Sequence, residues 1–373
     1  MHEISFARGI PAPECLPVEE LADCARTALL NDGATALSYG PGGGYAPLRE
    51  WIGERHGVDP GCVVVTNGSL QGFVFLAELL AGAGERVLVE APTYDRPLKI
   101  LEALGADVVA IPQRDDGIDV EVLAAELRRG ARPAFLYVIP TFQNPSGRTL
   151  GVAARKRLVE LAAEHDLLVI EDDPYGLVRF EGTVSPTLHE LEGGERVVYS
   201  SSFSKTAAPG VRVGYLVLPE TLARPVEAAA TATYITPSLI AQATVHEFLG
   251  RGALARNLEL VASLLKARRD ALIDALQAHL GPLGATWTIP EGGYFLWLDL
   301  PGVESVELLA EAEQVGVTFV PGPDFFPRGG GGRSAARLAF SFASPAQLSV
   351  AGIRLASAVS AAASVELREQ HAA

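Results

Sequence analysis

Hydrophobic positions along the chain follow two alternating patterns. Short runs rich in Val and Ile predict seven strands, at residues 62–66, 86–90, 107–111, 134–139, 167–172, 197–201 and 213–218. Between several of these runs, apolar residues recur at helical spacing, as in residues 71–80, 97–104 and 152–165. Strands that alternate with helices form a mostly parallel sheet that is covered on both faces. The pattern therefore predicts an α/β fold around a mostly parallel seven-stranded sheet, with functional groups at the carboxyl ends of the strands.

The pattern changes after about residue 236. A helical pattern, three shorter segments and a last helix follow at residues 253–279, 281–300, 315–320, 337–341 and from 345. These elements predict a second, smaller α+β domain. A Pro-rich passage at residues 9–17 separates the start of the chain from the sheet region, so we expect the first residues to join the smaller domain. The predicted division is a large domain at 37–248 and a small domain formed by 1–36 and 249–373.

Charge narrows the kinds of partner. The chain has 373 residues, of which 30 are Lys or Arg and 45 are Asp or Glu, and its net charge is −15. This charge disfavours nucleic acid and anionic lipid, because binding to either requires clustered cations. The longest uncharged stretch in the middle of the chain, residues 228–245, contains Pro237 and several Thr and is too polar to span a membrane. We expect no nucleic-acid partner and no membrane association.

The cysteines and the first ten residues indicate in which cellular compartment the protein is expected. Cys15, Cys24 and Cys62 form no CxxC pair, which favours a reducing environment. Residues 1–10 carry charges and no continuous apolar run, so no secretory leader is predicted. We therefore expect a cytoplasmic protein.

Three common kinds of site find little support. The seven His are scattered without an HExxH or HxH pattern, so no metal site is expected. No GxSxG motif marks a serine hydrolase. The Gly-rich segment 40–44 follows no predicted strand and lacks the GK[ST] ending of a nucleotide-binding loop. A turn before a helix is the simpler interpretation of that segment.

Lysine is the informative residue type. The chain has only four, and Lys99, Lys156 and Lys266 each fall in an amphipathic helical pattern, where a solvated face explains them. Lys205 instead follows the sixth predicted strand within a run of serines, seven residues before Arg212. Hydroxyls, an amine and a guanidinium at the end of a parallel strand suit a phosphorylated cofactor that binds covalently through Lys, as pyridoxal 5′-phosphate (PLP) does. A Ser-rich turn with an exposed Lys is the alternative for this segment alone.

Two further segments would complete such a site. One predicted strand ends in Glu171, Asp172 and Asp173. A buried carboxylate needs a partner, and the protonated pyridine nitrogen of PLP would supply one. Residues 67–72 join a predicted strand to a predicted helix, where free N–H groups and the helix dipole favour a phosphate. Together with Lys205, these segments strengthen the hypothesis of a PLP site.

Several motifs carry a resemblance to a known family. They are Ser202-x-Ser204-Lys205 with Arg212, Asp172-x-x-Tyr175, Asn144-Pro145-Ser146-Gly147, Pro140-Thr141-Phe142-Gln143, Leu37-Ser38-Tyr39-Gly40-Pro41, Phe340-Ser341-Phe342-Ala343-Ser344-Pro345 and the opening Ile4 to Pro11. Over about residues 4–348 the chain resembles fold type I PLP enzymes of the class I and II aminotransferases. Within them it is most similar to the 2-aminoadipate/kynurenine aminotransferase group. The resemblance implies a large PLP-binding domain and a smaller α+β domain.

The resemblance also implies roles at the cofactor ring. Lys205 would form a Schiff base with PLP and, once displaced by substrate, move a proton between the substrate Cα and the cofactor C4′. Asp172 would pair with the pyridinium nitrogen. Asn144 and Tyr175 would hydrogen-bond the phenolic oxygen of the ring, and Tyr94 would stack on its face, although Tyr94 could also be an ordinary core aromatic.

Further roles concern the phosphate and the substrate. The groups expected at the phosphate are Ser69, the Leu70 amide, Ser202, Ser204 and Arg212. The resemblance places Tyr39 at the phosphate of the neighbouring subunit, which implies a homodimer; packing of its own turn is the alternative for Tyr39. Arg337 would grip the substrate α-carboxylate, with Asn144 and Gly9 as further substrate contacts. Pairing of Arg337 with a surface acid is the other possibility.

Arg8 departs from the family pattern. Relatives commonly have Gly at this position and often carry a longer N-terminal arm over the substrate side chain, which leaves side-chain specificity open. Arg8 could bind the distal carboxylate of an acidic amino acid or of 2-oxoglutarate. An exposed Arg, or one paired at a dimer interface, explains it equally well.

Three functions are compatible with these motifs. The first transfers an amino group from an L-amino acid of the aminoadipate, aromatic or branched-chain type to a 2-oxo acid, with 2-oxoglutarate as the expected acceptor, by a ping-pong mechanism. The second is another PLP reaction, by a lyase, a cyclase or an oxidase of secondary metabolism, and would keep Lys205 and Asp172. The third is a non-catalytic PLP- or effector-binding regulatory body, which the net charge of −15 and the lack of length for a DNA-binding head disfavour. We expect an aminotransferase.

Overall fold

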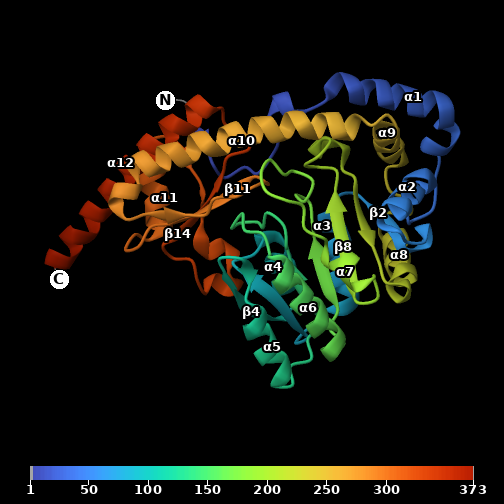
Figure 1. Ribbon diagram of the computed structural model, residues 1–373, viewed down its shortest axis with the longest axis horizontal. Helices are drawn as coiled ribbons and strands as arrows, with labels where there is room; N and C mark the ends of the chain where they lie inside the picture. Colours follow the sequence, from blue (N-terminus) through green and yellow to red (C-terminus); the bar gives the residue numbers. More distant parts are fainter. Residues whose placement is uncertain (1–2, 373) are drawn as a thin grey trace.

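Eight strands form the main sheet of the computed structural model, which describes residues 3–372 (Figure 1). In spatial order they are β2 (Val63–Thr66), β9 (Gly214–Val217), β8 (Val197–Ser202), β7 (Val169–Asp172), β6 (Phe135–Val138), β3 (Arg86–Ala91), β4 (Asp107–Arg114) and β5 (Gly117–Ile118). All seven predicted strands are present. The predicted count is one short, because β5 is a two-residue edge strand and is too short to give a hydrophobic run.

The directions of the strands bring most of their carboxyl ends to one edge. β8, β7, β6, β3 and β4 are parallel, whereas β9 is antiparallel to both of its neighbours. β2 therefore runs in the same direction as β8. As a result Thr66, Asp172 and Ser202, which end β2, β7 and β8, lie at the edge where ligands bind in sheets of this kind.

Helices cover both faces of this sheet, because successive strand side chains point to opposite faces. One face is covered by α3 (Ser69–Leu80), α4 (Asp95–Ala103) and α8 (Glu220–Tyr234). The other is covered by α5 (Val120–Arg128), α6 (Val152–His165) and α7 (Leu188–Glu192), and toward β2 by α2 (Ala46–His56) and α9 (Leu239–Gly250). None of the helices within residues 3–372 is both long and apolar enough to cross a lipid bilayer.

A smaller lobe lies beside the carboxyl edge of the large sheet. Its antiparallel sheet has the order β10 (Thr286–Trp287), β11 (Phe295–Asp299), β14 (Ala335–Ala339), β13 (Val320–Pro321). Its helices are α10 (Ala253–His279), α11 (Ser305–Gln314) and α12 (Pro345–Ala372). α12 packs on α10, and α10 continues from the small lobe toward α9 of the large one (Figure 1). This arrangement has the predicted α+β character.

The start of the chain contacts both lobes. β1 (Ile4–Ser5) pairs in parallel with β12 (Val317–Thr318) of the small lobe. α1 (Val18–Ala36) instead packs along α9 of the large lobe, where Cys24 and Ala28 are buried. The assignment of the first 36 residues to the small domain thus suits β1 better than α1, and the domain boundaries stay a prediction.

Candidate active site

A cavity of about 450 Å³ lies at the carboxyl edge of the large sheet, against the small lobe. Its lining includes every residue predicted for the site except Arg8 and Tyr39. These lining residues are Gly9, Ser69, Leu70, Tyr94, Asn144, Asp172, Tyr175, Ser202, Ser204, Lys205, Arg212 and Arg337. The fold thus gathers side chains from several strand ends and from both lobes around one space.

Lys205 follows β8 and is one of the residues that line the cavity. Its Nζ donates a hydrogen bond of 2.6 Å to the carbonyl oxygen of Gly9. Burial, together with the positive charges of Arg337 and Arg212, lowers the pKa of Lys205 to about 8. An appreciable fraction of this amine is therefore unprotonated near neutral pH, and only the unprotonated form can attack a carbonyl carbon.

Asp172 ends β7, and its two carboxylate oxygens have different surroundings. Oδ2 accepts a hydrogen bond of 2.7 Å from the hydroxyl of Tyr137. Oδ1 is buried and has no hydrogen-bond partner within the described part of the chain. Burial raises the pKa of Asp172 to about 6, while the hydrogen bond from Tyr137 opposes that shift. A buried carboxylate with one unpaired oxygen requires a donor or a cation, which a protonated ring nitrogen would provide.

The connection between β2 and α3 has the form of an anion site. α3 begins at Ser69, so the N–H groups of Ser69 and Leu70 lie at a helix N-terminus. Gly68 precedes them with a φ of 95°, a conformation that favours glycine. A Cβ atom on Gly68 would lie 2.4 Å from Nη2 of Arg212, so glycine also allows the guanidinium to approach.

Two serine hydroxyls extend this anion site from the end of β8. Ser202 Oγ donates to Ser204 Oγ at 2.9 Å. Nη1 of Arg212 lies 3.5 Å from the Ser204 hydroxyl. Hydroxyl, guanidinium and helix N–H donors around one end of the cavity suit a dianion such as a phosphate.

Arg337 projects from β14 into the other end of the cavity. It donates from Nη1 to Oδ1 of Asn144 at 3.0 Å and from Nη2 to the carbonyl oxygen of Ala7 at 2.7 Å. The rings of Phe295 and Phe325 lie 4.4 and 5.0 Å from its guanidinium carbon. Its Nε is buried and has no partner among residues 3–372. Burial lowers the pKa of Arg337, so a carboxylate that enters the cavity gains a desolvated cation with a free donor.

Residues 6–10 run beside the cavity, which Gly9 and Ile10 line, and four of their main-chain carbonyl groups accept hydrogen bonds. The carbonyl of Phe6 accepts from the main chain of β14 at 2.9 Å, and that of Ile10 accepts from the serine hydroxyl at position 341 at 2.8 Å. Between them, Ala7 and Gly9 accept from the two cavity cations described above. A Cβ atom on Gly9 would lie 2.2 Å from the ring of Phe295, so this position requires glycine.

Tyr94 and Tyr175 present neutral phenols to the cavity. Tyr94 lies directly before α4, and burial raises its pKa to about 12. Burial also raises the pKa of Tyr175, whose ring packs 5.5 Å from that of Tyr294 and 5.8 Å from that of Phe295. Both hydroxyls therefore keep a proton that can be donated to a ligand.

Arg8 and Tyr39 lie outside this lining. Arg8 is exposed, although Gly9, the next residue, lines the cavity. Tyr39 is 82% exposed, in the loop between α1 and α2. The N–H of Gly40 ties this loop to the Thr236 hydroxyl at 3.2 Å, next to α9. The roles predicted for Arg8 and Tyr39 stay predictions.

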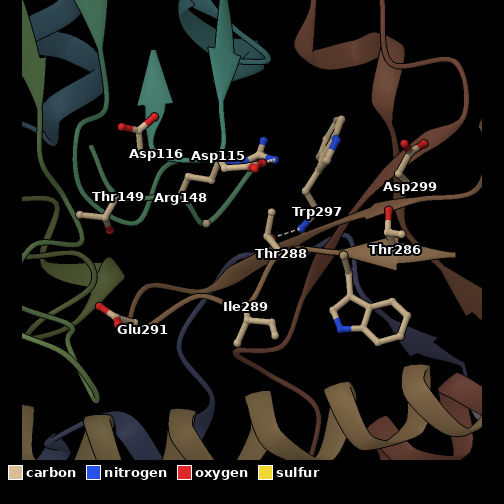
Figure 2. Close-up of a pocket in the computed structure, with 12 residues that line it drawn as sticks. Asp115, Asp116, Arg148, Thr149, Thr286, Thr288, Ile289, Glu291, Trp297 and Asp299 are labelled. Atoms are coloured by element: carbon tan, nitrogen blue, oxygen red, sulfur yellow. Dashed lines mark hydrogen bonds and ion pairs between the residues drawn. The ribbon is translucent and has the colours of Figure 1, made fainter. Parts of the chain in front are cut away.

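A second cavity, of about 690 Å³, is larger but holds none of the predicted residues (Figure 2). It lies outside β10 and β11, against the turn that follows β4. Several of its charged side chains already have partners, since Arg148 pairs with Asp115 at 3.3 Å and Glu291 with Arg179 at 3.5 Å. No lysine is among the residues that line it, all of which are described. This cavity offers no group that could bind PLP covalently.

Comparison with known proteins agrees with this geometry. The sequence profile of the aminotransferase class I and II family matches residues 7–351. The protein is a member of that family. Among curated relatives of this aminotransferase, a 2-aminoadipate transaminase from Thermus thermophilus is 39% identical over 333 residues, covering 88% of this chain and 83% of the relative. Aromatic-amino-acid aminotransferase 1 from Thermococcus litoralis is 35% identical over 334 residues, covering 87% and 80%.

Solved structures share the fold of the aminotransferase. The alpha-aminoadipate aminotransferase LysN of Thermus thermophilus, solved with N-(5′-phosphopyridoxyl)-L-leucine, has a TM-score of 0.92 at 35% identity and covers 97% of this chain and 93% of its own. The kynurenine aminotransferase of Pyrococcus horikoshii has a TM-score of 0.92 at 34% identity, covering 96% and 91%. The present aminotransferase is a PLP-dependent enzyme, and its cavity fits that cofactor. An amine, an unpaired buried carboxylate oxygen and an anion site surround the same space.

Three residues beside the site of the aminotransferase are not apparent from the sequence. Phe295 and Phe325 flank Arg337, and Tyr137 binds Asp172. Each lies in or next to an apolar run, so each is expected only to pack the core. The side-chain alternation of β6 would indicate which face Tyr137 takes, but not which residue of β7 it meets.

Proposed function

We propose that this aminotransferase moves the amino group of an L-amino acid of the aminoadipate, aromatic or branched-chain type to a 2-oxo acid, with 2-oxoglutarate as acceptor, in a ping-pong reaction. One observation carries the proposal: Lys205, Asp172 and Arg337, which come from different elements and from both lobes, line a single cavity. Relatives named as 2-aminoadipate and aromatic-amino-acid aminotransferases, and a neighbour solved with a leucine adduct, support this range of donors.

The phosphate end of the cavity anchors the cofactor. The N–H groups of Ser69 and Leu70, the hydroxyls of Ser202 and Ser204, and Arg212 would hold the phosphate. When bound, PLP supplies an electron sink for the electrons left at the substrate Cα. Asp172 would keep the ring nitrogen protonated, since its free Oδ1 is buried and unpaired. Tyr175 and Asn144 would donate to the phenolic oxygen, and Tyr94 would cover the ring face.

Lys205 would act twice. Its amine, whose pKa is lowered to about 8 by burial and by two neighbouring arginines, would first hold the cofactor covalently. Once substrate has taken its place, the free Nζ would remove the proton from the substrate Cα and return it at the cofactor C4′. A base with a pKa near the working pH suits this transfer, because it can both accept and release a proton.

Arg337 would orient the substrate for this proton transfer. Its planar guanidinium can bind the two oxygens of an α-carboxylate side by side. Asn144 already accepts from Nη1 and would fix the direction of the guanidinium. The carboxylate would thereby be held while the Cα faces Lys205. Gly9 also lines the cavity, and its carbonyl oxygen, which accepts from Lys205 Nζ, can contact substrate only by accepting from an N–H group.

Assembly into a homodimer forms part of the proposal. Tyr39 is exposed in its own subunit. Three apolar side chains are also more than half exposed: Leu30 in α1, Leu37 two residues before Tyr39, and Ile235, which precedes the Thr236 that bonds the Tyr39 loop. A second copy of the chain would cover these apolar side chains and bring Tyr39 to the partner's phosphate site. Tyr39→Phe is expected to lower PLP affinity about 10-fold, the size of one hydrogen bond to a charged group, while dimer mass is unchanged. Unchanged affinity would remove this role from Tyr39.

A panel of amino donors tests the reaction. The purified enzyme, loaded with PLP, is mixed with one amino acid at a time, and the absorbance of the bound cofactor is followed. A transaminase converts the cofactor to its amino form without release of ammonia or peroxide, and 2-oxoglutarate reverses the change. Release of ammonia or peroxide would instead assign a lyase or an oxidase. In the same assay Arg8→Ala tests the distal-carboxylate role, which fails if the constants for glutamate do not change.

A further inference from the structure

Tyr137 is fully buried in the middle of β6 and stands next to the residue that would bind the cofactor ring. Its hydroxyl donates to Oδ2 of Asp172 at 2.7 Å, and its exposed fraction is 1%. The register of β6 and β7 explains this contact: Tyr137 lies opposite Ile170, and Asp172 is two residues further along β7 on the same face. The strand pairing itself therefore brings the phenol to the carboxylate.

Packing holds the phenol in this position. The ring of Tyr137 meets that of Phe73 edge-on, with centroids 5.1 Å apart. Phe73 belongs to α3, whose first residues are Ser69 and Leu70 of the anion site. Tyr137 thus connects the carboxylate at the ring end of the cavity with the helix at the phosphate end.

The hydrogen bond decides which carboxylate oxygen is free. Because Oδ2 of Asp172 is taken by Tyr137, only Oδ1 remains unpaired. Burial and the charge of Asp172 raise the pKa of Tyr137 well above its ordinary value, so the phenol stays a donor at any working pH. A hydrogen bond to the ionised form favours ionisation, and it therefore opposes the effect of burial on the Asp172 carboxyl.

We propose that Tyr137 is a positioning residue that keeps the Asp172 carboxylate charged and turned so that Oδ1 faces the ring nitrogen of PLP. The inference rests on the proposed role of Asp172. Loss of the phenol would remove the donor to Oδ2 and leave the carboxyl beside the charge of Asp173, with the Ser200 side chain as the weaker stabilising contact. The carboxyl would then stay protonated to higher pH and would hold the ring nitrogen less well.

The neighbouring carboxylate offers a matched control. Tyr199 donates to Oδ2 of Asp173 at 2.9 Å, and both residues are buried. Asp173 follows Asp172 in sequence but does not line the active-site cavity. Tyr199→Phe therefore removes a buried phenol–carboxylate bond of the same kind without touching the proposed ring contact.

The experiment compares wild type, Tyr137→Phe and Tyr199→Phe as full-length protein. PLP affinity of the cofactor-free proteins is measured at pH 6.5 and 8.5, and the pH titration of the bound cofactor's absorbance is recorded. Tyr137→Phe is expected to lower PLP affinity about 10-fold at pH 6.5 and less at pH 8.5, where the Asp172 carboxyl regains its charge. It should also shift the midpoint of the absorbance titration, and Tyr199→Phe should do neither.

The outcomes separate two ideas. Equal affinities and titrations for Tyr137→Phe and wild type would overturn the positioning role, as would an equal effect of Tyr199→Phe. A loss of affinity in Tyr137→Phe that is the same at both pH values would also overturn it, because it would indicate general damage. If wild type itself fails to bind PLP, the proposed function fails first.

Discussion

Two cavities of the molecule, the predicted site and the one outside β10 and β11, differ in a way that their volumes do not predict. The cavity outside β10 and β11 is the larger, about 690 Å³ against about 450 Å³, yet several of its polar side chains already have partners (Figure 2). Arg148 there is paired with Asp115, and Asp299 accepts from Ser334 at 2.7 Å. The smaller cavity leaves Oδ1 of Asp172 and Nε of Arg337 buried without partners within the described residues. Unpaired buried atoms also occur elsewhere in the fold, so what distinguishes the smaller cavity is that two of them belong to an acid and a base that line one space together with Lys205.

The largest expected effect on activity comes from removal of the Lys205 amine in the smaller cavity. Lys205→Ala should abolish the covalent link to PLP that borohydride reduces to a stable amine. It should also lower the rate of amino transfer by at least about 10³-fold, because both the proposed covalent anchor and the proposed general base are lost. Reduction with borohydride followed by peptide mass analysis locates the link. Circular dichroism controls for folding. A cofactor adduct on any other lysine would contradict the assignment.

Arg337→Gln should have the next largest effect. Removal of a buried charge that binds the substrate carboxylate is expected to cost about 2–5 kcal/mol, seen mainly as a higher KM for the amino donor. Steady-state kinetics with a good donor measures it. An unchanged KM would show that the carboxylate binds elsewhere.

In protein without PLP, the free energy of unfolding should show how much the buried amine of Lys205 destabilises the fold. An unfolded lysine keeps its proton up to a pKa near 10.4, whereas Lys205 in the fold releases it near 8. Between these values the unfolded chain holds more protons, so the free energy of unfolding rises with pH, and below pH 8 the destabilisation is at its full size. Lys205→Met should therefore be more stable than wild type by about 2 kcal/mol at pH 7, with a smaller difference at pH 10.

Urea unfolding of both proteins at the two pH values measures this difference. Since other groups titrate in both proteins, only the change in the difference between them reports on Lys205. A difference that does not vary with pH would mean that the amine is not desolvated.

The smallest effect is expected in the larger cavity. Arg148→Gln removes a guanidinium that is paired with an exposed carboxylate, so kcat, KM and PLP affinity should change by less than about 2-fold. The same assays used for Arg337→Gln apply. A change in kcat or KM as large as that of Arg337→Gln would show that both cavities take part in the reaction. The distinction between the two cavities would then be wrong.

Strand ends were the part of the site that the sequence could predict. Asp172, Ser202 and Lys205 lie at or just past the ends of apolar runs, and parallel strands bring such ends to one edge. Arg337 could be placed only through the family resemblance, because it lies inside a short strand of the other lobe. Its closeness to Asn144 depends on how the two lobes meet.

Other features depend on long-range pairing that a single sequence does not state. Tyr137 looks like a core residue until the register of β6 and β7 is known. β5 could not be predicted, because a strand of two residues is too short to show alternating hydrophobic and polar positions. α1 has an apolar stripe that suits any partner, and only the fold shows that it lies on α9. For Tyr39, the proposed contact belongs to a second subunit.

The main-chain contacts of residues 6–10 have a consequence for the design of variants. Backbone oxygens of Phe6, Ala7, Gly9 and Ile10 make the bonds that hold this strip against the catalytic groups. A side-chain library at position 8 therefore leaves those bonds in place and alters only what projects outward. Position 9 tolerates no such library, because any Cβ would push into Phe295. Variation at position 8 with Gly9 kept unchanged therefore tests the predicted role of Arg8 in donor choice without disturbing the main chain at the site.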